Sequence, residues 1–228
     1  MPTHTAIVIG LVLYGLLMLG VSLFWAARVK KAADYLVAGR GLPYWVLTGT
    51  IVGTGIGTGV VIGGSGLAYR HGWAGCAYPI GLGLGAIAAG LCFASMRRYR
   101  FMTLGEEIAS YYGGHRGVVE VANIGLFVSQ LCWLTVQIMG GGSVLSVVTG
   151  LPLNLCMVLS GLITAMISIP GGLLTVVYTD LLQAMILLCG FASLTCVALH
   201  DAGGLAGLRE SVPPEYFSFL GVASLGWG

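Results

Sequence analysis

The sequence predicts an all-α protein that crosses a membrane several times. Of its 228 residues, 57% are hydrophobic and only 8% are charged, and the mean hydropathy is +0.95. Soluble domains carry about a quarter charged residues, so this composition excludes an ordinary soluble core. A helix needs about 20 apolar residues to span a bilayer, and apolar segments of about that length recur along the whole chain.

Six apolar segments are predicted as membrane-spanning helices. They cover residues 5–27, 43–69, 73–96, 117–148, 153–169 and 174–199. The first lacks the basic start of a signal peptide and is too long for one, so we expect it to be retained. The fourth is long enough to tilt strongly or to project beyond the bilayer. The fifth is short and is closed by Pro170-Gly171-Gly172, which cannot continue a helix.

The positions of the basic residues predict the orientation in the cell membrane. If every predicted segment crosses, eight of the ten cationic residues fall in two loops on one side. These are Arg28, Lys30, Lys31 and Arg40 in one loop, and Arg97, Arg98, Arg100 and Arg116 in the other. Only Arg70 and Arg209 lie on the opposite side. Because Lys and Arg are enriched in cytoplasmic loops, we expect the N-terminus to lie outside.

Two segments between or after the predicted spans have their own patterns. Thr103-Leu104-Gly105-Glu106 has the spacing of a capping box, which predicts a short helix over 103–112 at the cytoplasmic surface. The chain becomes polar after residue 199 and apolar again over 217–228. That last stretch is too short to cross a bilayer. We expect it to be the start of a seventh span and the chain to be an N-terminal fragment.

No arrangement of residues in the sequence predicts an enzyme. The histidines and most acidic residues lie in loops or at span ends, without the convergent spacing of a catalytic site. The six cysteines stand singly in apolar segments, which indicates helix packing rather than disulfides or a zinc site. The glycine run at 49–66 does not fit GxGxxG, so no nucleotide site is expected. Nothing in the sequence predicts binding to nucleic acid.

The run GTIVGTGIGTGVVIGGSG at residues 49–66 is the most informative feature of the predicted second span. One interpretation is close helix packing, because pairs such as Gly49/Gly53 have GxxxG spacing. The other is an ion site. Thr50, Thr54 and Thr58 recur every four residues and give one helix face a line of hydroxyls. The glycines also permit a local break that would turn backbone carbonyls towards Na⁺.

Asp180 is an acidic residue inside the sixth predicted span, and such residues usually belong to an ion path or a paired site. The alternative is a carboxylate favoured by the helix N-terminus and bonded to Thr179 or to a loop amide. Gln130 and Gln137 could face a polar cavity or could form hydrogen bonds between helices. The cluster at 140–143 more simply indicates close packing of helices.

Four groups of residues follow one another in an order that is typical of one known family. The first group is Asp34-Tyr35, Ala38 to Pro43 and Trp45, followed by the glycine-rich run and then by Tyr69 and Gly72. The second, Thr103-Leu104-Gly105-Glu106 before Tyr112-Gly113, resembles the T-x-P-E surface motif. The third runs from Gly171 to Gln183 and resembles GGLxAVxxTDxxQ. The fourth is Ser224 to Gly228. Together the four groups resemble the sodium:solute symporter family, and the fourth resembles the start of the seventh helix in its proline-type members.

The resemblance implies an inverted-repeat (LeuT-type) transporter fold of five plus five helices, preceded by one extra helix. Residues 1–42 would then form the peripheral first transmembrane helix and a cytoplasmic loop. Residues 43–199 would form the first five-helix repeat. Residues 200–228 would form an extracytoplasmic loop and the start of an incomplete seventh helix. The missing C-terminal half of the transporter would be the main protein partner.

The function implied by the resemblance is Na⁺-coupled symport of a small organic solute, with Na⁺ as coupling ion and no other cofactor. The matching Na⁺ ligands are the carbonyls of Gly53 and Ile56, and Asp180 matches an aspartate on the cytoplasmic Na⁺ pathway. The candidates for lining the solute cavity beside the break are Thr54, Thr58, Tyr78, Gln130 and Gln137. Two other hypotheses stay open, a transporter-like sensor module and a half-transporter subunit that needs a partner.

Two departures from the family pattern bear on the solute. Gly55 stands where proline-type members carry an aspartate, which argues against proline. Ala77-Tyr78-Pro79 stands where sugar-type members carry Glu-Trp-Asn, which argues against a sugar.

Overall fold

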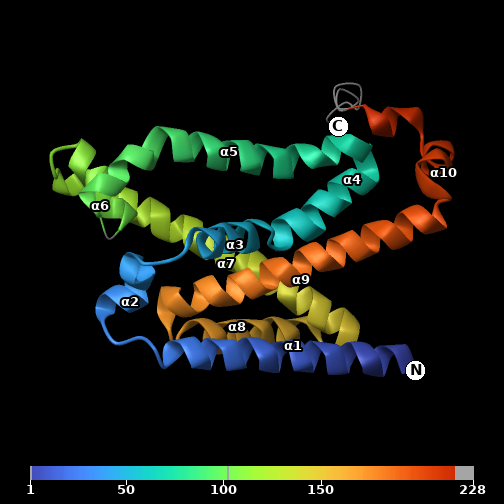
Figure 1. Cartoon of the computed structure of the whole chain (residues 1–228), viewed down its shortest axis with the longest axis horizontal. Coiled ribbons are helices and arrows are strands. Elements are labelled where there is room, and N and C mark those ends of the chain that lie inside the picture. Colours follow the sequence, from blue (N-terminus) through green and yellow to red (C-terminus); the bar gives the residue numbers. More distant parts are fainter. Residues whose placement is uncertain (1, 102, 219–228) are drawn as a thin grey trace. The chain divides into compact units, whose positions relative to one another are not determined.

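The computed structural model of the chain describes residues 2–101 and 103–218, and every regular element within these ranges is helical (Figure 1). Two compact units are formed, each from two stretches of sequence. The first combines Met1–Pro43 with Ala86–Thr179, and the second combines Tyr44–Gly85 with Asp180–Gly228. We describe the two units separately.

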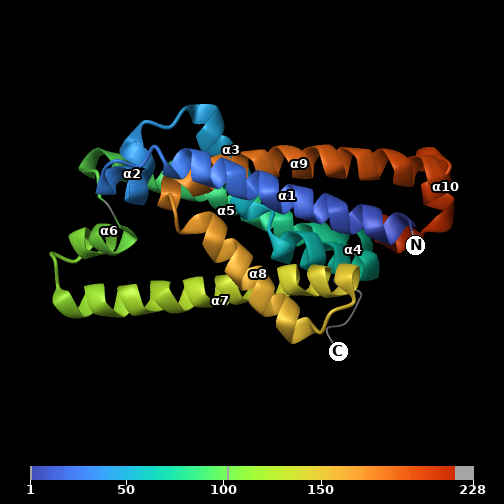
Figure 2. The ribbon, with the colours of Figure 1, turned by 90° about the horizontal axis from the view of Figure 1, so that it is seen from below.

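Three helices of the first unit, α1, α7 and α8, pack against one another. The elements of this unit are α1 (Pro2–Ala26), α2 (Ala32–Val37), a 3₁₀ turn (Ala38–Arg40), the end of α5 (Ala77–Phe93), a second 3₁₀ turn (Ala94–Tyr99), α6 (Leu104–Tyr111), α7 (Arg116–Thr149), α8 (Leu153–Ser168) and the first turns of α9 (Gly172–Asp201). Figure 2 shows α8 lying diagonally between α1 and α7. A Cβ atom on Gly142 would lie 2.7 Å from Met157 Cγ of α8. The predicted packing role of the 140–143 cluster is therefore confirmed.

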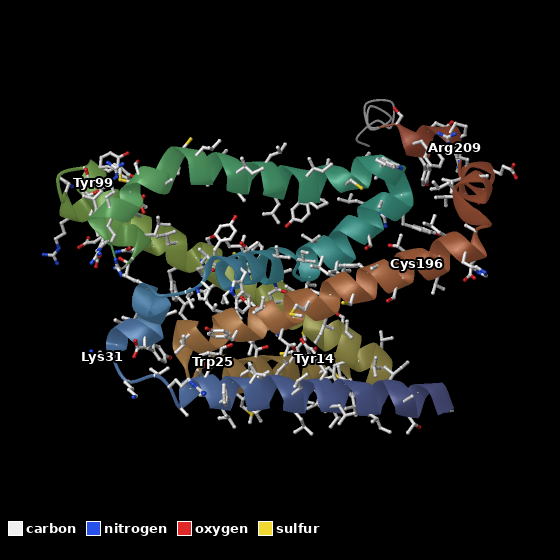
Figure 3. The ribbon with its side chains drawn as sticks, in the orientation of Figure 1. Tyr14, Trp25, Lys31, Tyr99, Cys196 and Arg209 are labelled. Atoms are coloured by element: carbon white, nitrogen blue, oxygen red, sulfur yellow. The ribbon has the colours of Figure 1, made fainter. Side chains whose placement is uncertain are left out.

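The core of this unit joins α1 to the ends of α8 and α9. Met18, Ser22, Thr175 and Val177 are buried in this unit, and Cys156 is buried at the start of α8. The Ser22 hydroxyl donates to the carbonyl of Ile167, and the Thr175 hydroxyl donates to the carbonyl of Ser22 at 3.4 Å. One turn further along α1, Trp25, which is labelled in Figure 3, stacks on Tyr178 with ring centroids 3.5 Å apart. Buried hydroxyls thus bond to helix carbonyls, which satisfies their hydrogen-bonding capacity at little cost.

Hydrogen bonds to backbone carbonyls tie the loop after α1 to the rest of the unit. The Asp34 carboxylate accepts the amides of Lys30 and Lys31 at 3.1 and 3.0 Å, which holds the start of α2. The Tyr35 hydroxyl donates to the carbonyl of Ile169 at 3.1 Å, and Arg40 donates to the carbonyl of Arg100 at 2.6 Å. The basic loops at residues 28–40 and 97–116 are therefore directly connected.

In the second unit the predicted span at 43–69 is interrupted. Helix α3 (Tyr44–Gly55) ends before two non-helical residues, Ile56 and Gly57, and a π-helix (Gly59–Gly64) then leads into α4 (Ser65–His71). Gly72 has a φ of +60°, a conformation that glycine adopts without strain, and the chain reverses there through a 3₁₀ turn (Gly72–Cys76) into α5. The unit also contains most of α9, then α10 (Gly204–Ser211) and a final 3₁₀ turn (Pro214–Phe217).

Four helical stretches are long and apolar enough to cross a membrane, which fits the predicted polytopic membrane protein. They are His4–Ala26, Gly59–Met96, Arg116–Thr149 and Gly172–Asp201. The stretch from Gly59 to Met96 includes the turn at Gly72. Helix α8 is apolar but has only 16 residues, and α3 has only 12. Six full-length spans are therefore not found in the described residues, and the five-helix repeat stays a prediction. The expected start of a seventh span lies outside the described residues, except for Phe217 and Ser218.

Candidate functional site

The centre of the candidate site is a carboxylate held by two hydroxyls within the second unit. Asp180 of α9 accepts hydrogen bonds at Oδ2 from Thr50 Oγ1 at 2.7 Å and from Thr54 Oγ1 at 2.9 Å. Both threonines belong to α3, more than 120 residues earlier in the chain. We call these three side chains the Asp180 cluster.

Helix periodicity and the glycines of α3 explain why the cluster forms. Thr50 and Thr54 are four residues apart, so their hydroxyls lie on the same helix face. Gly49 and Gly53 have the same spacing and bring α3 close to α9. A Cβ atom on Gly53 would lie 2.6 Å from the carbonyl oxygen of Asp180, too close for any side chain. The glycines therefore serve close packing, and that packing places the hydroxyls at Asp180, so the two interpretations of the run are compatible.

The structure corrects one predicted partner of Asp180. The alternative interpretation had its carboxylate bonded to Thr179 or to a loop amide. Instead, the Thr179 hydroxyl donates to the carbonyls of Thr175 and Val176, at 3.2 and 2.9 Å. Thr50 was predicted only as part of the line of hydroxyls on one face of the span and not as a partner of Asp180, although its spacing from Thr54 indicates that both hydroxyls reach the same place. The cluster consists of oxygens only, and carboxylate and hydroxyl oxygens are suitable ligands for a hard cation.

The break in the second span leaves two backbone carbonyls without a helical amide partner next to this cluster. The last α-helical bond of α3 runs from the amide of Ile56 to the carbonyl of Val52, at 2.9 Å. The amide of Val60, which would continue the helix by bonding to Ile56, donates to Gly57 instead, at 3.1 Å. Within the described part of the chain, no backbone amide donates to the carbonyl of Gly53 or of Ile56. These are the two carbonyls predicted to bind Na⁺.

The remaining predicted site residues fall into two groups. Thr58 and Tyr78 are near the break. Thr58 precedes the π-helix, and a Cβ atom on Gly59 would lie 3.3 Å from the Tyr78 hydroxyl. Gln130 and Gln137 lie in the first unit, seven residues apart on one face of α7. Gln130 is exposed and Gln137 is half-buried. The structure therefore brings Gly53, Thr54 and Asp180 together with Thr50, and it places Tyr78 beside the resumed helix.

Comparison with known proteins identifies the family. The family model described as the sodium:solute symporter family matches residues 35–213, which include the Asp180 cluster and the break. The sodium/pantothenate symporter of Escherichia coli is 30% identical over 217 residues, covering 90% of this chain and 44% of that protein. Sodium/myo-inositol cotransporter 2 of Bos taurus is 29% identical, covering 94% of this chain and 31% of that protein.

A further relative and the solved structures complete the comparison. Sodium/glucose cotransporter 1 of Oryctolagus cuniculus is 25% identical, covering 88% of this chain and 31% of that protein. No solved structure is significantly similar to the chain. The chain spans less than half the length of the three relatives named here. These relatives are Na⁺-dependent transporters by name rather than enzymes. The match to the family model covers well over half of the sequence, and the chain therefore belongs to the sodium:solute symporter family.

Proposed function

We propose that the protein is a Na⁺-coupled symporter of a small organic solute. The observation that carries the proposal is the break at Ile56 and Gly57. It leaves carbonyls without a helical amide partner next to a carboxylate that is held by two hydroxyls. Discontinuous helices of this kind form ion and solute sites in many secondary transporters. The relatives support the same class of function, since their names include sodium together with pantothenate, myo-inositol or glucose.

The proposed Na⁺ site uses the carbonyls of Gly53 and Ile56. Na⁺ is a hard cation and, like Ca²⁺ and Mg²⁺, prefers oxygen ligands. The C-terminal end of a helix also carries partial negative charge, and α3 ends at Gly55 between these two carbonyls. Two carbonyls do not fill the coordination shell of a cation. We propose that the other ligands come from a second repeat, in a part of the relatives' length that this chain does not cover.

We propose that Na⁺ binds transiently at Asp180 after it leaves the carbonyl site and before it reaches the cytoplasm. Its carboxylate supplies the negative charge that the carbonyl site lacks. The Thr50 and Thr54 hydroxyls stabilise the ionised form while no cation is bound. A threonine hydroxyl can also turn its lone pairs towards a cation. Na⁺ and solute would bind together to an outward-open state, and a rocking motion of the repeats would then release Na⁺ past Asp180.

The proposed solute cavity lies beside the break. Thr58 and Tyr78 would line it from the second unit, with Thr54 at its edge. Gln130 and Gln137 of α7 belong to the first unit and stay predictions from the sequence. The five-helix repeat at 43–199, the peripheral helix at 1–42, the outer segment at 200–228 and an N-terminus outside the cell belong to the same proposal. The names of the relatives include a sugar, a polyol and a vitamin. We therefore propose a small, polar organic solute.

Na⁺ binding to the purified full-length protein tests the role of Asp180. We expect Asp180→Asn to weaken the binding of radiolabelled Na⁺ about tenfold, the effect of losing about 1.4 kcal/mol of charge interaction. Asp201→Asn is a matched control, because Asp201 lies on the same helix but is exposed at its end. Unchanged Na⁺ binding by Asp180→Asn would return Asp180 to a structural role. An equal loss in Asp201→Asn would show that the effect is not specific to the cluster.

Solute uptake into proteoliposomes tests whether transport of the solute is coupled to a Na⁺ gradient. Pantothenate, myo-inositol and glucose should be compared, each with an inward Na⁺ gradient and with K⁺ replacing Na⁺. We expect at least one of them to accumulate only with the Na⁺ gradient, since Na⁺ binding stabilises the state that binds solute. Wild-type protein that binds no Na⁺ at 100 mM would contradict the proposed function.

A further inference from the structure

An open pocket of about 430 Å³ lies at the surface of the second unit, at the segment predicted to be extracytoplasmic. Residues from three separate elements line it. They are Trp73 from the turn before α5, Leu205, Ala206, Leu208 and Arg209 from α10, and Phe217 from the last 3₁₀ turn. We call it the Arg209 pocket. Its volume is in the range of small-molecule sites, which are about 300–1,000 Å³.

The wall formed by α10 follows from helix periodicity. Leu205, Leu208 and Arg209 have i, i+3, i+4 spacing and lie on one face of this helix. Two contacts fix the opposite walls. The Tyr216 hydroxyl donates to the carbonyl of Tyr69 at 3.2 Å, and the backbone of Tyr216 lies directly against Gly72. The turns that carry Trp73 and Phe217 are therefore held against each other.

Among the described residues, Arg209 is the only charged one that lines the pocket, and Figure 3 shows it towards the end of α10. In the described part of the chain it forms neither a hydrogen bond nor an ion pair, although Glu210 and Glu215 are near in sequence. The other walls are apolar or aromatic. A guanidinium group offers paired donors that match a carboxylate, and aromatic rings offer surface for an apolar body.

We infer that the Arg209 pocket binds an organic carboxylate on the outer side of the membrane. The carboxylate pairs with Arg209, and the apolar body of the ligand lies against Trp73 and Phe217. This inference deepens the proposed symport function, on which its physiological role rests, by naming anionic solutes as the class that the protein collects. The phosphate of an anionic lipid has the same oxyanion chemistry, so the experiment must separate a soluble ligand from a lipid headgroup.

The test uses 3-phenylpropionate and its uncharged amide as probes. Binding is measured by calorimetry on the full-length protein in nanodiscs of phosphatidylcholine. We expect the carboxylate to bind at least about tenfold more tightly than the amide, as the charged pair contributes one decade or more. Arg209→Gln should abolish that preference, while Arg209→Lys should retain part of it. Arg70→Gln is the matched control, because Arg70 is the other basic residue predicted to lie outside and does not line the pocket.

Three results would overturn the inference. They are equal binding of carboxylate and amide, no change in Arg209→Gln, and an equal loss in Arg70→Gln. A second experiment tests whether the pocket binds a lipid, by comparing 3-phenylpropionate binding and lipid retention in nanodiscs with and without phosphatidylglycerol. If that lipid is retained through Arg209 while 3-phenylpropionate does not bind, the pocket is a lipid site and the inference fails.

Radiolabelled Na⁺ binding provides the folding control for each pocket variant. The same measurement separates this inference from the proposed function. Asp180→Asn should lose Na⁺ affinity and keep 3-phenylpropionate binding, whereas Arg209→Gln should show the reverse. Wild-type protein that binds Na⁺ but not 3-phenylpropionate therefore counts against the pocket alone, and wild-type protein that binds 3-phenylpropionate but not Na⁺ counts against the Na⁺ site alone.

Discussion

Gly53 is the residue on which the candidate site depends most directly. Its backbone lies so close to Asp180 that an added Cβ atom would be 2.6 Å from a carbonyl oxygen, which cannot move without moving α9. We expect Gly53→Ala to push α3 away from α9 and to lengthen the bonds from Thr50 and Thr54 to Asp180. Overpacking of this kind costs about 1–3 kcal/mol. A lower melting temperature and weaker Na⁺ binding of the full-length protein should be measured together.

Gly55 provides the control for Gly53. It lies on the same helix, two residues later, but an added Cβ atom would be 3.6 Å from Leu82, an ordinary contact. Gly55→Ala should therefore leave both the melting temperature and Na⁺ binding close to those of the wild type. If the two variants behave alike, the close approach of α3 and α9 does not control the cluster.

The position of Asp180 in a span and the shared face of Thr50 and Thr54 could be predicted from local sequence alone. Their pairing could not, because it joins helices that are 130 residues apart and depends on the packing of Gly49 and Gly53 against α9. The Arg209 pocket illustrates the same limit. In the sequence analysis, Arg209 contributed only to the predicted orientation in the membrane. The pocket could not be predicted, because Trp73 and Phe217 become neighbours of Arg209 only after folding.

At the scale of single elements, the local signals predict helix ends better than helix continuity. The segments predicted at 117–148 and 153–169 correspond to α7 and α8 within about one residue at each end. A cluster of glycines, in contrast, either stays within a continuous helix or breaks it. Gly140, Gly141 and Gly142 stay within α7, where Gly141 and Gly142 pack against α8, whereas the run at 49–66 breaks at Ile56 and Gly57. Packing with a neighbouring helix decides between these outcomes, and it cannot be read from composition.

Helix α6 offers a prediction at this scale. The expected cap is confirmed, because the Thr103 hydroxyl accepts the amide of Glu106 at 3.2 Å and α6 begins directly afterwards. Thr103→Ala removes the acceptor, which costs about 1 kcal/mol of helix stability. We expect faster amide hydrogen exchange in α6 and no change in α7. Thr103→Ser keeps an acceptor and should exchange like the wild type, and equally fast exchange in Thr103→Ser would argue against the cap.

At the scale of the whole molecule, the charge distribution predicts which loops face the cytoplasm. The loops that carry eight of the ten basic residues include α6, and the outer segment includes α10. Two exposed serines of similar size to cysteine report on these loops, Ser110 in one and Ser211 in the other. We expect Ser211→Cys to react with a membrane-impermeant maleimide in intact cells and Ser110→Cys to react only after permeabilisation.

The topology experiment requires a background without the six natural cysteines, because all of them are free thiols and four are exposed in the described structure. Replacement by serine or alanine must first be shown to preserve Na⁺ binding. Labelling of Ser110→Cys from outside, with Ser211→Cys protected, would reverse the orientation. It would also contradict the extracytoplasmic place of the Arg209 pocket, whose α10 wall is continuous with Ser211. A single labelling pattern thus tests the side of the membrane from which solute is collected and the side to which Na⁺ is released.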